Sequence, residues 1–112
     1  MKKQWLWNSG LFLCLAIIAA CAAGLPHPTD ALVTEARRSD PSATIETLEE
    51  GRKLFIADCS GCHNLRRPTS RRPEEWPKIV ERMARRAKIP TNDKERILEY
   101  LMAVSGADGP SK

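Results

Sequence analysis

Residues that bind metals are scarce in this sequence, which has only two histidines and four cysteines among 112 residues. Two of the cysteines, Cys14 and Cys21, lie in an apolar N-terminal stretch. The part of the chain with the pattern of a folded domain offers only Cys59, Cys62 and His63. A structural zinc site takes four protein ligands, so this set is too small for one.

The sequence also lacks the alternating pattern of β-strands, internal repeats and low-complexity segments. Without a βαβ pattern, a thioredoxin-like redox pair is disfavoured. The formal net charge of +4 is too small to indicate nucleic-acid binding, and we expect no nucleic-acid partner. No general acid–base pair or nucleophile constellation stands out, so the sequence indicates that the protein is not an enzyme.

The N-terminal stretch has the composition of an export signal. Two lysines precede an uncharged apolar segment, residues 11–20, and small residues follow it. The sequence IAAC at residues 18–21 resembles the lipobox of bacterial lipoproteins. That resemblance implies that residues 1–20 are removed and that Cys21 becomes the lipidated first residue, which would hold the domain at a membrane surface.

Two other interpretations of this stretch remain open. Ordinary cleavage near residues 20–23 would release a soluble periplasmic protein, and an uncleaved segment 5–25 is just long enough to span a bilayer. All three interpretations export the domain. We expect it on the periplasmic side of a Gram-negative-type envelope, anchored in the membrane through lipid on Cys21.

Downstream of the signal, the composition divides the chain into three parts. Residues 21–44 contain three prolines and no apolar period, which predicts a flexible tether. The folded domain is expected at residues 45–106. A disordered tail is expected at residues 107–112.

Three helices are predicted within the domain. The first covers residues 48–58 and starts at the capping-box sequence TLEE, residues 47–50. The second covers residues 77–87, where a proline suits the first position and apolar residues recur at helical spacing. The third covers about residues 93–104 and ends near Gly106. We therefore expect a small all-α fold of three helices.

The sequence CSGCH, which runs from Cys59 to His63, directly follows the first predicted helix. A disulfide between Cys59 and Cys62 would close too small a loop to stabilise the fold much. C-x-x-C-H is instead the signature of covalent haem attachment, in which the thiols add across the two vinyl groups. We expect one haem c, attached through Cys59 and Cys62 and ligated by His63. The porphyrin would also enlarge the core of a domain near the lower size limit for folding alone.

Other residues around this motif support the same interpretation. Gly51 and Phe55 precede CSGCH, Trp76 and Met83 follow it in a W-x6-M pattern, and the last predicted helix contains ILEYL. In these features the sequence resembles a small class I type cytochrome c domain over most of the predicted domain. The resemblance implies that the helices wrap one haem and that the first and last helices cross closely, with Gly51 against Tyr100.

The resemblance also implies a second axial ligand, most often methionine, which raises the reduction potential. Met83 lies between the haem motif and the last helix, where the family places this ligand. Met102 lies within the last helix, where family members pack core. With neither bound, the iron would be five-coordinate. The family also points to a proline carbonyl, that of Pro68 or Pro73, as the acceptor for the second imidazole nitrogen of His63.

Charge is distributed unevenly along the chain. Between Arg66 and Lys88, nine basic and three acidic residues give a net charge of +6, whereas residues 25–58 carry −3. The basic segment predicts either a solvated face near haem propionates or anionic lipid, or a surface on which an acidic redox partner docks.

Together these observations predict a membrane-associated cytochrome c that transfers one electron at a time. It would act in a periplasmic redox chain as a shuttle or as the haem subunit of a dehydrogenase. The alternative is an open-site haem protein that senses or binds a diatomic ligand. The two differ in whether a methionine occupies the sixth position on the iron.

Overall fold

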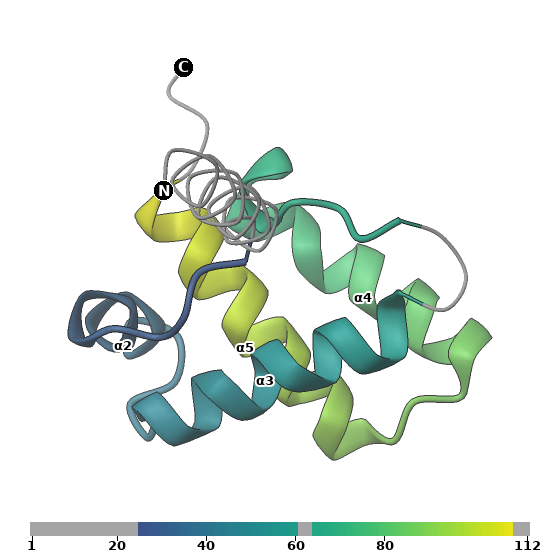
Figure 1. The fold of residues 1–112 in the computed structure, drawn as a ribbon, viewed down its shortest axis with the longest axis horizontal. Coiled ribbons are helices and arrows are strands. Elements are labelled where there is room, and N and C mark those ends of the chain that lie inside the picture. The colour runs from purple at the N-terminus through teal and green to yellow at the C-terminus, as the bar shows by residue number, and fades with distance from the viewer. Residues whose placement is uncertain (1–24, 61–63, 109–112) are drawn as a thin grey trace, which may run out of the picture.

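The computed structural model describes residues 25–60 and 64–108, which fold into one all-α globule (Figure 1). Within these residues there is no strand. The elements in chain order are α2 (Asp30–Ala36), α3 (Ile45–Cys59), the 3-10 turns η1 (Pro68–Ser70) and η2 (Pro73–Glu75), α4 (Trp76–Ala87) and α5 (Thr91–Ala107). The all-α prediction is confirmed, and the described residues contain four α-helices where three are predicted.

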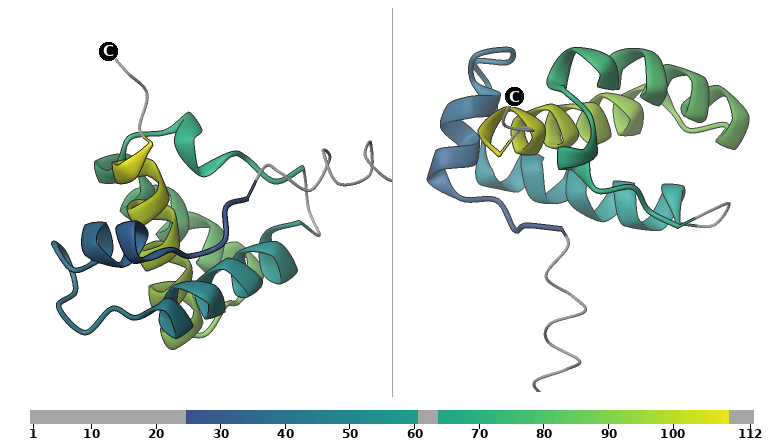
Figure 2. Two further views of the ribbon diagram at one scale, coloured as in Figure 1. Left: turned by 60° about the vertical axis from the view of Figure 1, so that its left-hand side comes forward. Right: turned by 90° about the horizontal axis from the view of Figure 1, so that it is seen from above.

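The additional helix, α2, lies in the segment predicted to be a tether. The hydroxyl of Thr29 caps it by accepting from the Leu32 amide at 3.4 Å. Leu32, Val33 and Ala36 are buried, and Figure 2 shows α2 beside the C-terminal part of α5. Sequence reasoning missed α2 because seven residues are too few to establish a period, and the flanking prolines suggest a linker.

Helix α3 begins three residues before its predicted start. Thr44, not Thr47, is the N-cap, and the two threonines form a reciprocal capping box. The Thr47 amide donates to Thr44 Oγ1 at 3.2 Å, while the Thr44 amide donates to Thr47 Oγ1 at 3.0 Å. The capping box predicted at residues 47–50, in which Glu50 would accept from the amide of Thr47, is therefore wrong: the box is formed by Thr44 and Thr47.

Helices α3 and α5 cross, as Figure 1 shows, and Gly51 lies where their backbones come closest together. A Cβ atom added to Gly51 would overlap the backbone carbonyl of Arg96 and lie 3.0 Å from Tyr100 Cβ. Tyr100 is fully buried at this crossing. The close contact predicted between Gly51 and Tyr100 is confirmed, and it explains a glycine inside a helix.

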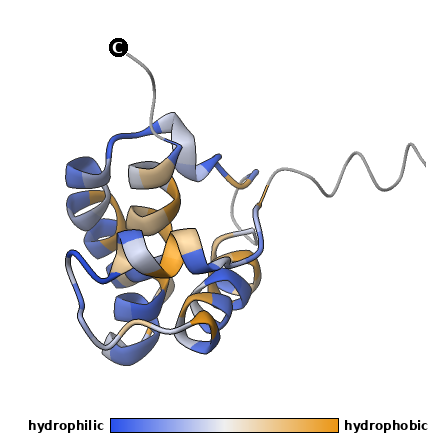
Figure 3. Ribbon diagram, turned by 90° about the vertical axis from the view of Figure 1, so that its left-hand side faces the viewer, coloured by the Kyte–Doolittle hydropathy of each residue, from blue (hydrophilic) through white to orange (hydrophobic). Residues whose placement is uncertain are grey.

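The predicted positions of the last two helices are confirmed to within a few residues. Helix α4 ends at Ala87, and its C-cap, Lys88, has a left-handed backbone conformation (φ 56°). Helix α5 starts at Thr91, two residues before its predicted start, and continues through Gly106 to Ala107, three residues beyond its predicted end. The buried side chains are nearly all apolar, and in Figure 3 the hydrophobic parts of the ribbon, in orange, lie mainly where helices face one another.

Among the residues that the structure describes, no helix has the length and apolar character needed to cross a bilayer.

Candidate functional site

A cavity of about 670 Å³ lies where the C-terminal end of α3 meets α4 and α5. Its volume is within the range of ligand and cofactor sites in proteins. Phe55 and Cys59 line it from α3, Leu65 from the following segment, and Ile97 and Leu101 from α5. The site thus lies at the point where the chain enters the CSGCH sequence.

Helix α4 turns its apolar stripe toward this cavity. The six residues of the predicted stripe all line the cavity: Trp76, Ile79, Val80, Met83, Ala84 and Ala87. Only Trp76, Val80 and Ala84 are buried by the rest of the protein. The apolar face of α4 therefore lines the cavity along its length, and only part of this face is buried by the protein core.

The structure locates only part of the predicted haem-binding set. Cys59 is the last residue of α3, is half-buried, and forms part of the cavity wall while packing against the apolar core. Cys62 and His63 lie outside the described residues, as does Cys21. The expected attachment of haem and ligation by His63 therefore remain predictions.

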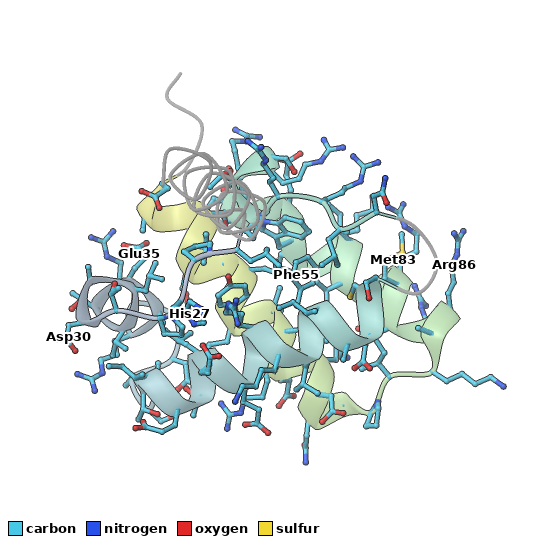
Figure 4. The ribbon with its side chains drawn as sticks, in the orientation of Figure 1. His27, Asp30, Glu35, Phe55, Met83 and Arg86 are labelled. Carbon is cyan, nitrogen blue, oxygen red and sulfur yellow. The ribbon has the colours of Figure 1, made fainter. Side chains whose placement is uncertain are left out.

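The two candidate methionine ligands occupy different surroundings. Met83 is half-buried and lines the same cavity as Cys59, from α4; Figure 4 labels it together with Phe55 of α3. Met102 lines a separate cavity of about 720 Å³ between α2 and α5. Of the two sulfur atoms, only that of Met83 belongs to a residue at the candidate haem cavity, which favours Met83 as the ligand.

Trp76 fixes the segment that precedes α4. Its indole N–H donates to the carbonyl of Pro68 at 3.1 Å, and its backbone N–H donates to the carbonyl of Pro73. Both prolines suggested as acceptors for His63 thus already accept a bond from Trp76. Each carbonyl retains a second lone pair, so the proposed bond to His63 stays a prediction.

Four exposed arginines stand around the cavity: Arg66, Arg71, Arg82 and Arg86. Asp58 is the only acidic residue in the lining. Arg71 lies 3.8 Å from Glu75, whereas within residues 25–60 and 64–108 the other three arginines form no ion pair. This leaves net positive charge at the cavity edge, where it could pair with ligand carboxylates.

The cavity next to Met102 has the opposite charge. Its lining includes six acidic residues, Glu35, Asp40, Glu50, Asp93, Glu95 and Glu99, and one basic residue, Arg96. Arg96 lies 2.9 Å from Glu99 and 3.6 Å from Glu50. The two cavities share no lining residue, so the charge asymmetry of the sequence is also an asymmetry in space.

The cavity near Cys59 suits an apolar cofactor that carries carboxylate groups. Its walls are mostly apolar, the side chains of one cysteine and one methionine lie in them, and arginines surround it. Within the described part of the chain, no group of three or more histidine, cysteine or acidic side chains is arranged to hold a metal ion.

No protein-family model matches the sequence, and comparisons with curated proteins and with solved structures give no significant match.

Proposed function

We propose that this protein is a c-type cytochrome that carries single electrons on the periplasmic side of a bacterial membrane. The observation that best supports this function is the position of Cys59, the first residue of a C-x-x-C-H sequence, in the wall of a cavity of cofactor size. Cys59 and Cys62 would hold the haem, and His63 and Met83 would ligate its iron. Bound in this way, haem supplies reversible one-electron redox chemistry.

The side chains around the cavity would set the polarity and the redox balance of the bound haem. Phe55, Trp76 and Ile97 are buried and would exclude water from the ring, which lowers the local polarity. A thioether from Met83 would favour the reduced state. The cavity-edge arginines would offset the negative charge of the propionates.

The same arginines support a protein partner for the site. Arg82 and Arg86 are exposed at the edge of the cavity, on the segment between Arg66 and Lys88 that carries the excess of positive charge. An acidic redox partner approaching this face would be steered toward the haem edge, which raises the association rate most at low salt. We propose this face as the docking surface of the electron-transfer complex.

Location follows from the N-terminal sequence. Maturation at Cys21 would place lipid on the first residue and keep the domain at the membrane, where it would act as a shuttle or as the haem subunit of a dehydrogenase. Cys21 lies outside the described residues, so the anchor rests on the sequence IAAC alone.

The proposal is tested on the mature protein purified from a host that exports and matures c-type cytochromes. Intact mass should show one covalent haem, and the optical spectrum should be low-spin with a methionine–iron charge-transfer band. Met83→Ala should abolish that band, whereas Met102→Ala, a matched change at the other cavity, should leave it. A chain without haem mass would overturn the proposal. High-spin iron that binds carbon monoxide avidly in the unmodified protein would favour an open-site sensor.

A further inference from the structure

The segment just after the N-terminal signal is fixed to the folded domain. Tyr100 Oη, from α5, donates to the carbonyl of Pro26 at 2.9 Å. Arg52 Nε, from α3, donates to the carbonyl of Leu25 at 3.2 Å. His27 Nδ1 lies 3.4 Å from a carboxylate oxygen of Glu49, also on α3.

These contacts come from α3 and α5 and hold residues 25–27 against the folded domain. Leu25 packs against the apolar core, and the segment crosses α5 in Figure 1 before entering α2. Tyr100 is fully buried and Arg52 is half-buried, so their bonds to the segment are partly shielded from water. Figure 4 labels His27 on this segment, outside the cavity that contains Met83.

We infer that residues 25–28 are a clamp that fixes the chain to the domain directly after the membrane anchor and so holds the domain close to the bilayer. The inference rests on the membrane anchor of the proposed function. It applies whether the anchor is lipid on Cys21 or an uncleaved apolar segment, because in both cases the chain enters the described domain at Leu25. The partner surface would be the lipid headgroup region itself.

The length of chain between the anchor and the clamp limits how far the domain can lie from the bilayer. A chain spans at most about 3.3–3.6 Å per residue. From Cys21 to Leu25 there are four residue steps, which allow a separation of at most about 14 Å. A free tether from Cys21 to Thr44 would allow roughly 80 Å. A domain held by the clamp must therefore exchange electrons with partners that also lie close to the membrane.

The test compares two insertions of the same twelve-residue Gly-Ser segment in the full-length, membrane-reconstituted protein. One follows Gly24, before the clamp, and the other follows Pro28, behind it. Neutron reflectometry on a supported bilayer measures the gap between headgroups and protein. The first insertion should widen the gap by about 20 Å, the root-mean-square span of such a linker, and the second should leave it unchanged. Equal widening by both insertions would overturn the inference.

Two further measurements keep the outcomes separate. If insertion after Pro28 disturbs folding, insertion after Arg38, in the exposed turn that follows α2, replaces it with the same expectation. Covalent haem is measured by intact mass, so a haem-free protein that keeps the short gap would refute the proposed function and not the clamp. A mature chain that carries haem but neither lipid nor signal would refute the membrane contact and leave the electron-carrier function standing.

Discussion

The indole N–H of Trp76 lies 3.1 Å from the carbonyl oxygen of Pro68, and both residues are buried. This bond ties the turn η1 to the first residue of α4 across the segment that follows the haem motif. It gives Trp76 a structural role that its position in the W-x6-M pattern alone does not reveal.

Replacement of Trp76 should therefore destabilise the protein beyond the loss of ring volume. Trp76→Phe keeps an aromatic ring but leaves the buried Pro68 carbonyl without its donor, which costs about 1–3 kcal/mol. Denaturant unfolding of the haem-loaded protein measures the change. Ser70→Ala removes an exposed hydrogen bond in the same turn and serves as the control, with an expected change below about 0.5 kcal/mol. Similar effects of both changes would show that the indole bond contributes little.

A side chain at position 51 should force α3 and α5 apart. Gly51→Ala gains about 1 kcal/mol in helix propensity, yet its Cβ would overlap the backbone carbonyl of Arg96, which cannot move independently of α5. We expect a net loss of about 2 kcal/mol or more in the free energy of unfolding.

Gly106→Ala is the matched control for this change. The added Cβ there would meet only the carboxylate end of Glu35, a flexible side chain that can turn away. Its stability should be unchanged or slightly higher by thermal or denaturant unfolding. A tolerated alanine at position 51 would contradict the close helix crossing.

Alkaline pH should weaken the fold through Tyr100, the only tyrosine in the chain. Burial raises the pKa of Tyr100 to about 12 from an ordinary value near 10. Below pH 10 the phenol is neutral in both states, and its contribution is complete. Between about pH 10 and 12 the unfolded chain alone releases the proton, so stability falls by about 2–3 kcal/mol.

The single tyrosine makes this effect measurable without ambiguity. Phenolate absorbance of the native protein should titrate near pH 12. The free energy of unfolding should already fall between about pH 10 and 12. In Tyr100→Phe the part of the decline that tyrosine causes should disappear. Titration of the native protein near pH 10 would contradict the burial of this hydroxyl.

Removing charge at the cavity edge should slow association with an acidic electron donor. The pair Arg82→Gln and Arg86→Gln should lower the second-order rate of haem reduction about fivefold at low ionic strength, with little effect at high salt. Stopped-flow reduction by an acidic redox protein measures this second-order rate. Arg85→Gln is the control, because Arg85 lies on the same helix but pairs with Glu81 at 3.9 Å and does not line the cavity. Equal slowing by all variants would indicate an effect of net charge alone.

The sequence predicted best the features that repeat over many residues. Helices α4 and α5 show a long apolar period, and Gly51 indicated the close crossing because a glycine inside a helix otherwise costs stability. Short elements could not be predicted in this way. Helix α2 buries only three residues, and its cap, Thr29, is a polar residue of the kind that is also found in linkers. The cap of α3 was misplaced because Thr44 and Thr47 both suit the position.

The candidate site was predictable only as far as local spacing defines it. The motif indicated Cys59 and its neighbours, and chain order favoured Met83 over Met102. Neither the bonds from Trp76 to two proline carbonyls nor the selection of Arg82 and Arg86 over Arg85 at the cavity could be inferred, because they depend on how helices pack in three dimensions.

Arginines around one cavity and carboxylates around the other give the domain a permanent electric dipole moment. In the electric field of a negatively charged partner this dipole experiences a torque that turns the arginine-lined edge toward the partner before any contact forms. The domain would thus be rotated into a productive orientation during its approach, and a larger fraction of its encounters would lead to a complex.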